Sequence, residues 1–207
     1  MSKEVEFING ITIPRKLYNR IENLAVSLLI KHNIRNLPID PFALAVLENF
    51  VLRPYSSLPG EAIKMLLINA QDGFSYYDPH ANKTVICYDD SQCYSRQRFT
   101  VAHEIGHILM EHKHGSVLAE HIANHFAGYL LAPSPLINAL NCEDCFDVKE
   151  KFQISDDCAY YRFNNYKNWL KYQIDKVYER RLMKHFSSKK GVMFMIYFNI
   201  KDCANNS

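Results

Sequence analysis

The pentapeptide His103-Glu104-Ile105-Gly106-His107 constrains this chain more than any other feature. Four residues turn an α-helix through about 400°, so the two imidazoles lie roughly 40° apart on one face and can bind one cation together. Glu104 lies about 100° from His103 around the helix, where its carboxylate can reach a water on the open side of that cation. The pentapeptide therefore predicts a hydrolytic zinc site on a helix.

The residues around the pentapeptide decide between a zinc site and two solvated histidines. Apolar side chains surround both imidazoles, among them Phe99, Val101, Ile105 and Ile108. Such a segment is typical of a buried helix, and buried imidazoles need polar partners. A shared zinc ion is such a partner, so we predict that a buried helix over residues 95–111 carries the site.

Composition places the chain among ordinary globular proteins. Its 207 residues suffice for one core or for a core with a small appendage, and its hydrophobic content is 48%. The net charge of +2 does not demand a nucleic-acid or membrane partner. Glu4 and Glu6 interrupt any signal-like start, and the apolar stretch 192–200 is about half the length of a membrane helix. We expect a cytoplasmic protein without a membrane partner.

Six cysteines are present, and in the cytoplasm they should be reduced. Cys142 and Cys145 form a C-x-x-C motif, but a structural zinc site would need two more ligands at suitable spacing, and none is obvious. We therefore expect two free thiols at a turn that connects helices.

The first half of the chain mixes helices and strands. Thr12-Ile13-Pro14 is expected to open a helix, and Asp40-Pro41 a shorter one. A strand is predicted over 51–55 and a helix over 61–70. A hairpin with strands 73–77 and 84–88 then leads into the motif helix.

The second half reads as helical. Helices are predicted over 117–131, 147–153 and from Ser155 to about Trp169. A longer amphipathic helix should follow, with Leu170, Ile174, Val177 and Leu182 on one side, and 191–200 is either a strand or a tail. These elements predict an α+β fold in which helices flank a small antiparallel sheet.

A catalytic zinc ion usually has three protein ligands, so a third must lie outside the pentapeptide. The position six residues after His107 is Lys113, so the extended metzincin motif is absent. Glu111 lies too far along the same helix, and His112 and His114 lie in a loop, which makes a poor rigid ligand. The helix that follows is the better source.

Helix 117–131 offers two pairs at i,i+4 spacing. Glu120 can bind zinc while Asn124 accepts the free ring N–H of a ligand histidine and fixes its tautomer. This pairing favours Glu120 as the ligand and Asn124 as its supporting residue. A site built on His121 and His125 stays open as the alternative.

The motifs together resemble the ImmA/IrrE-type metallopeptidases. The resemblance rests on three segments in the right order and spacing: Arg98-Phe99-Thr100-Val101-Ala102-His103-Glu104-Ile105-Gly106-His107, Glu120-His121-Ile122-Ala123-Asn124-His125-Phe126-Ala127 and Leu130-Leu131-Ala132-Pro133. It extends upstream over Ile86-Cys87-Tyr88-Asp89-Asp90 and weakens after Pro135. Ala132 stands where the family commonly has methionine, and His121 and His125 are unusual neighbours of the ligand.

The resemblance implies a zincin-like fold and a gluzincin-like peptidase with His103, His107 and Glu120 as zinc ligands and Glu104 as the catalytic base. It also implies a separately encoded substrate, a helix-turn-helix repressor of a mobile element or toxin–antitoxin-like locus. We expect a metallopeptidase core over residues 1–135 and a helical C-terminal extension over 136–207. Strand 84–88 is a plausible sheet edge for binding substrate backbone.

Two other functions compete with proteolysis. Phe152-Gln153-Ile154-Ser155 lies between two short helices like a helix-turn-helix, and residues 167–190 hold eight Lys and Arg, which raises DNA binding through the C-terminal region. A solvated helix face explains the same charges more simply. The second competitor is a non-proteolytic zinc-binding regulator that blocks a partner by binding it.

Overall fold

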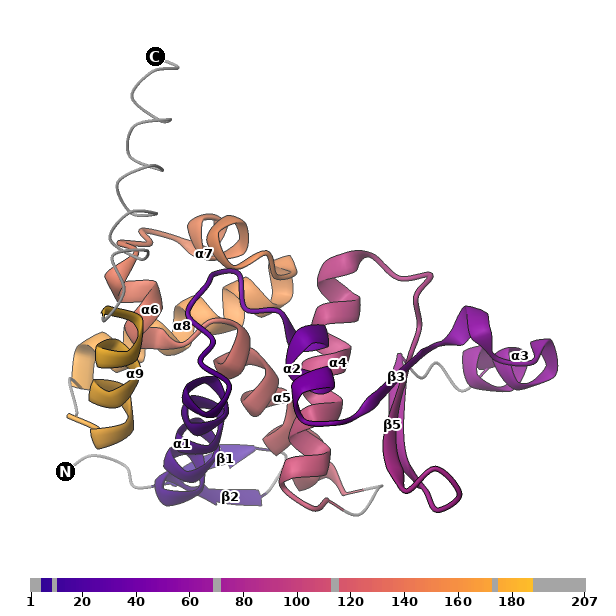
Figure 1. The fold of residues 1–207 in the computed structure, drawn as a ribbon. Coiled ribbons are helices and arrows are strands. Elements are labelled where there is room, and N and C mark those ends of the chain that lie inside the picture. Colours follow the sequence, from indigo (N-terminus) through magenta and orange to yellow (C-terminus); the bar gives the residue numbers. More distant parts are fainter. Residues whose placement is uncertain (1–4, 9–10, 69–71, 113–115, 173–174, 188–207) are drawn as a thin grey trace.

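The structure is a computed structural model that describes residues 5–8, 11–68, 72–112, 116–172 and 175–187. It has the expected α+β fold, in which helices surround a small sheet (Figure 1). The elements, in chain order, are β1 (Val5–Ile8), β2 (Ile11–Pro14), α1 (Arg15–Lys31), α2 (Pro41–Leu47), β3 (Val51–Pro54), a 3₁₀ turn (Tyr55–Ser57), α3 (Gly60–Ile68), β4 (Gly73–Asp78), β5 (Lys83–Tyr88), α4 (Tyr94–Leu109), α5 (Val117–Leu131), α6 (Ser134–Ala139), α7 (Cys145–Phe152), α8 (Asp156–Tyr172) and α9 (Val177–Ser187).

The main sheet has three strands in the order β3-β5-β4. The predicted hairpin is confirmed, since β4 and β5 pair antiparallel with Gly73 opposite Tyr88. The expectation of a purely antiparallel sheet is wrong, because β3 pairs parallel with β5, with Val51 opposite Val85. Helix α3 and strand β4 separate these two strands in the chain, which lets β5 run in the same direction as β3.

This order also corrects the expected substrate-binding edge. Strand β5 lies between two partners, so its backbone groups pair on both sides, whereas β4 lies at an edge of the sheet. The hairpin alone could not settle this, because β3 could have paired with either of its strands.

Helices α4 and α5 pack side by side between the sheet and α1, at the centre of the molecule (Figure 1). Their close contact depends on a glycine, since a Cβ at Gly106 would lie 2.9 Å from Cδ1 of Phe126. Ile105 and Phe126 are fully buried beside this contact. The packing holds the histidine-bearing face of α4 against the helix that carries Glu120.

Two buried arginines form hydrogen bonds with the segments that connect the helices. The guanidinium of Arg98 on α4 donates to the carbonyl oxygens of Ile39 (2.6 Å) and Phe152 (2.9 Å), which lie before α2 and at the end of α7. Arg162 on α8 donates to the carbonyl of Ala132 (3.0 Å) and to the hydroxyl of Ser134 (3.2 Å). Charge-assisted hydrogen bonds of this kind satisfy buried carbonyls that no secondary structure reaches.

The C-terminal region differs in detail from its predicted helices. Helix α6 is not among the helices predicted from the sequence; Pro135 lies in its first turn, a position that suits proline. The single helix expected to carry Leu170 and Leu182 is two helices, since α8 ends at Tyr172 and α9 begins at Val177. Leu170 and Val177 are exposed, whereas Leu182 is buried. The break lets the start of α9 turn towards Glu22 on α1.

Side chains from both predicted parts of the chain contribute to one core. Val148, Phe152 and Leu182 belong to the same buried cluster as Leu29 on α1 and Phe126 on α5. The boundary near residue 135 stays a prediction. The predicted strand or tail over 191–200 and Ile174 of the expected stripe lie outside the described residues.

Two further expectations concern the thiols and the membrane. Cys142 and Cys145 are free thiols, as predicted; Cys142 lies in the turn before α7, and Cys145 is the first residue of that helix. No helix in the part of the chain that the structure describes is long and apolar enough to cross a membrane.

Candidate metal centre

Helix α4 places the two histidines of the pentapeptide next to each other. Their Nε2 atoms lie 2.8 Å apart, and His107 is buried. Helix α5 brings Glu120 to the same point, with Oε2 3.2 Å from Nε2 of His103 and Oε1 3.4 Å from Nε2 of His107. The structure thus brings together side chains from two helices, although Glu120 lies thirteen positions after His107 in the sequence.

The spacing of these atoms fits a small cation. Nitrogen and oxygen ligands at 2.0–2.1 Å from a tetrahedral zinc ion lie about 3.3 Å from one another. The two carboxylate contacts agree with this value, and the two imidazole nitrogens are about half an ångström closer. Within the described residues, His103, His107 and Glu120 form the group of His, Cys, Asp or Glu side chains able to hold a metal ion.

The surroundings of His103 favour the form that binds metal. Burial lowers the pKa of its imidazole, although the nearby Glu120 carboxylate and the hydrogen bond with Asn124 act in the opposite direction. A neutral imidazole is the metal-binding species. Nδ1 of His103 lies 2.9 Å from Oδ1 of Asn124, so the amide oxygen can accept the ring N–H and leave the lone pair of Nε2 facing the cluster.

Glu104 lies beside this cluster with its carboxylate held by the sheet. The hydroxyl of Ser75 on β4 donates a 2.8 Å hydrogen bond to Oε2 of Glu104, and both side chains are buried. Burial raises the pKa of Glu104 to about 7, against the lowering effect of the Ser75 hydrogen bond and with a further raising effect of the Glu120 charge. A carboxylate with a pKa near neutrality is suited to act as a general base.

A cleft of about 520 Å³ opens over these residues. Gly73 and Phe74 at the beginning of β4 line it, together with His103, Glu104 and Glu120. A smaller hollow of about 300 Å³ continues beyond the histidines along β4. The edge strand therefore borders the candidate site on both sides of the Ser75–Glu104 contact.

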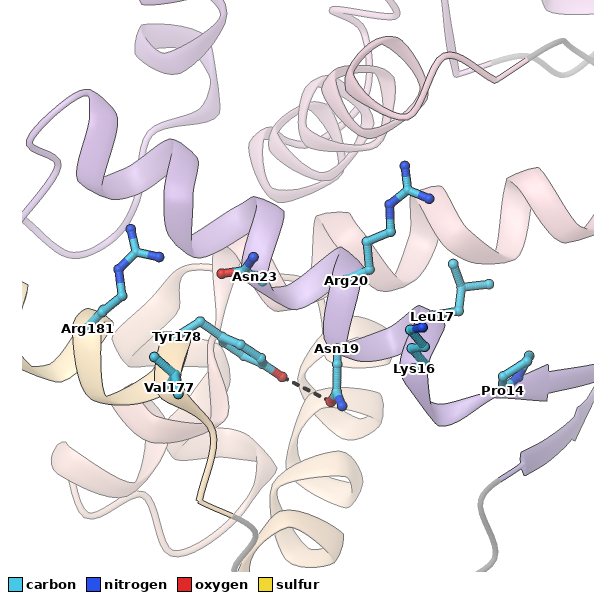
Figure 2. A pocket seen from close by; sticks show the side chains of 9 residues that line it. All are labelled: Pro14, Lys16, Leu17, Asn19, Arg20, Asn23, Val177, Tyr178 and Arg181. Carbon is cyan, nitrogen blue, oxygen red and sulfur yellow. Dashed lines mark hydrogen bonds between the residues drawn. The ribbon is translucent and has the colours of Figure 1, made fainter.

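A larger hollow of about 880 Å³ lies elsewhere, between the beginnings of α1 and α9 (Figure 2). Lys16, Arg20 and Arg181 lie around it, and the hydroxyl of Tyr178 in its wall lies 3.2 Å from Oδ1 of Asn19. None of its lining residues is a histidine, cysteine or carboxylate. It therefore lacks the donor atoms that a metal centre needs. Although it is larger than the cleft over His103 and Glu120, it is not the candidate metal site.

His121 and His125, the alternative metal ligands predicted from the sequence, contact residues outside the cluster. Nε2 of His121 lies 2.8 Å from the hydroxyl of Tyr18, and Nε2 of His125 lies 3.2 Å from Oε1 of Glu22, both on α1. The two histidines thus face α1 and are not part of the group of possible metal ligands among the described residues. Glu111 is exposed at the end of α4, and His114 lies outside the described residues.

Sequence reasoning missed two residues at this site. Ser75 gave no signal beyond its position in a predicted strand, because the register that brings it to Glu104 depends on how the sheet packs on α4. His112 was weighed only as a possible ligand in a loop, whereas its Nδ1 lies 3.2 Å from Nδ1 of His107.

A His-His-Glu cluster lies in a cleft beside a sheet edge, and the helix that carries the two histidines also carries a buried glutamate. This arrangement defines the class of zincin-like metallopeptidases. A family model described as the IrrE N-terminal-like domain, peptidase family M78, matches residues 61–164. The match covers half of the chain, so the protein belongs to this family. It includes the sheet strands β4 and β5, helices α4 and α5 and the first half of α8. A search among curated proteins found no match.

Proposed function

We propose that the protein is a zinc-dependent endopeptidase in which His103, His107 and Glu120 hold the metal. The observation that carries the proposal is the convergence of two Nε2 atoms and one carboxylate within 4.8 Å, next to the buried carboxylate of Glu104. Family membership supports a peptidase that uses a metal. Two neutral imidazoles and one carboxylate are a donor set typical of catalytic zinc.

Bound zinc would supply a Lewis acid that polarises a substrate carbonyl and acidifies water. The chain supplies the proton transfers. Glu104 takes a proton from the attacking water and later delivers it to the departing amine, a role for which its raised pKa suits it. Ser75 keeps the other side of that carboxylate oriented, and Asn124 keeps His103 in the tautomer that offers Nε2.

Strand β4 is the element that we propose binds the substrate backbone. One side of this strand has no strand partner in the described sheet, and its beginning lines the cleft over His103 and Glu104. An extended peptide that pairs with such an edge would run across the Glu104 carboxylate. Strand addition gives binding through main-chain hydrogen bonds and leaves side-chain selection to the adjoining hollows.

The substrate that we propose is a separately encoded helix-turn-helix repressor of a mobile element or toxin–antitoxin-like locus. The support is the resemblance of residues 98–133 to the ImmA/IrrE-type peptidases. A cytoplasmic location follows from that substrate.

Co-expression with the repressor encoded beside this gene tests the function. Wild-type protein is expected to deplete the full-length repressor on an immunoblot, whereas Glu104→Gln and Glu120→Gln are expected to leave it intact. Zinc analysis separates the two variants, because Glu104→Gln should retain the metal and Glu120→Gln should lose it. Derepression by Glu104→Gln with the repressor still full length would instead establish a regulator that acts by binding.

A further inference from the structure

The second imidazole of the cluster has a neighbour on its far side. Nε2 of His107 faces His103 and Glu120, and its other ring nitrogen, Nδ1, lies 3.2 Å from Nδ1 of His112. The two rings meet edge to face, with centroids 5.2 Å apart. We infer that His112 is a positioning residue that fixes the tautomer and ring orientation of His107. The inference rests on the proposed zinc site.

The chemistry of imidazole assigns the direction of this hydrogen bond. A neutral ring carries one N–H, and a ring that binds metal through Nε2 must carry its proton on Nδ1. Nδ1 of His107 is then the donor, so Nδ1 of His112 is the acceptor and the proton of His112 lies on Nε2. The distance is at the long end of the normal range for an N–H donor.

The backbone conformation after α4 places the ring of His112 beside that of His107. Glu111 has a positive φ of 53°, its N–H donates to the carbonyl of Ile108 (3.1 Å), and the N–H of His112 donates to the carbonyl of His107 (3.0 Å). This pattern is the Schellman motif, which ends a helix by folding the chain back over its last turn. His107 therefore contacts His112 twice: its carbonyl accepts the backbone N–H of His112, and its ring faces the His112 side chain.

Each histidine of the cluster thus has its own support. Asn124 on α5 faces Nδ1 of His103, and His112 faces Nδ1 of His107. Loss of such a partner typically weakens metal binding by about 10- to 100-fold, because the free ligand then samples the wrong tautomer and ring orientation. We expect His112→Phe, which keeps a ring but has no acceptor, to lose affinity for zinc to this extent.

The test measures zinc dissociation constants of wild type, His112→Phe, His112→Ala and His112→Asn by competition with a chromophoric chelator. The amide oxygen of asparagine reaches nearly the same point as Nδ1 of histidine and accepts a hydrogen bond. His112→Phe and His112→Ala should bind about 10- to 100-fold more weakly, and His112→Asn should recover most of the loss. The visible absorption spectrum of the cobalt-substituted proteins should change in the first two variants and return towards wild type in the third.

The outcomes separate this inference from the proposed function. Equal affinity in wild type, His112→Phe and His112→Ala would overturn the role of His112 alone. Weak binding by His112→Asn as well as by the other two would also overturn it, because the residue would then matter only for its shape. A wild-type protein that binds no zinc would overturn the proposed site itself, and the role of His112 with it.

Discussion

The hydroxyl of Ser75 donates a 2.8 Å hydrogen bond to the carboxylate of Glu104, and so connects the edge strand β4 to helix α4. Both side chains are buried. The contact orients the carboxylate and links its position to the strand that borders the cleft. Because Ser75 belongs to β4, a displacement of this strand would also move the hydrogen-bond donor of the Glu104 carboxylate.

Ser75→Ala is expected to slow cleavage and leave the zinc content unchanged. A hydrogen bond to a charged group contributes about 1.5–3 kcal/mol, so kcat should fall about tenfold or more if Glu104 depends on it. The measurement is the rate of repressor cleavage together with zinc analysis. Ser57→Ala is the matched control, since that hydroxyl is exposed and donates to the carbonyl of Pro54. A rate equal to that of the control would show that Glu104 needs no such support.

Replacement of Asn124 is expected to weaken zinc binding. Its amide oxygen lies 2.9 Å from Nδ1 of His103, so Asn124→Leu removes the acceptor that fixes the tautomer of this proposed ligand. Zinc affinity is expected to fall about 10- to 100-fold. Asn124→Asp keeps an acceptor and should bind zinc nearly as well as wild type. Equal affinity in the leucine variant, measured by chelator competition, would contradict the assigned hydrogen bond.

Gly106→Ala is expected to destabilise the fold. An alanine Cβ would lie 2.9 Å from Cδ1 of Phe126, and the Phe126 side chain is fully buried. Overpacking of this kind costs about 1–3 kcal/mol, whereas the gain in helix propensity is about 1 kcal/mol, so a net loss is expected over most of that range. Urea unfolding should show Gly106→Ala to be less stable than wild type. Gly60→Ala, where no atom lies within 4 Å of the new Cβ, should not lose stability.

Glu22 on α1 makes stability depend on pH. Burial raises the pKa of this carboxyl, but its contacts with His125 and Lys176 outweigh the burial and hold the pKa at about 2, below the ordinary 4.5. Lys176 and the hydroxyl of Tyr178 donate to Oε2 at 2.7 and 2.6 Å. Because the folded-state pKa is the lower one, this stabilisation is complete above pH 4.5 and is lost as the pH falls towards 2.

Glu22→Gln is expected to be less stable than wild type by about 3 kcal/mol at pH 7, from the size of that pKa shift and the buried partners it leaves unpaired. The difference should narrow as the pH falls from 4.5 to 2. Urea unfolding of both proteins across this range measures it. A difference that stays constant with pH would show that Glu22 has an ordinary pKa in the folded protein.

The sequence predicted those parts of the site that depend on local spacing. Two histidines at i and i+4 share a face on any helix, and the i,i+4 pair of Glu120 and Asn124 could be weighed by the same geometry. The hydrophobic periodicity located α4 and α5 to within two residues at each end. Helical geometry is set by neighbours in the chain, so it is accessible without the fold.

What the sequence could not predict depends on contacts between distant segments. Strand β3 could pair with either strand of the hairpin, so the central position of β5 was not accessible. Ser75 lies on the face of β4 that packs on α4, but no pattern in the strand indicates that this face meets Glu104. The turn that positions His112 has Glu111 where glycine is the usual residue, so the helix ending lacked its normal signal.

Mass spectrometry of the products tests the central claim most directly. The purified zinc-loaded protein is incubated with the purified repressor, beside Glu104→Gln loaded with the same amount of zinc. Hydrolysis of one peptide bond by the wild type should give two fragments whose masses sum to the intact repressor plus one water, and Glu104→Gln should give none. Fragments formed at the same rate by Glu104→Gln, or an intact repressor after incubation with the wild type, would contradict a peptidase that acts through Glu104.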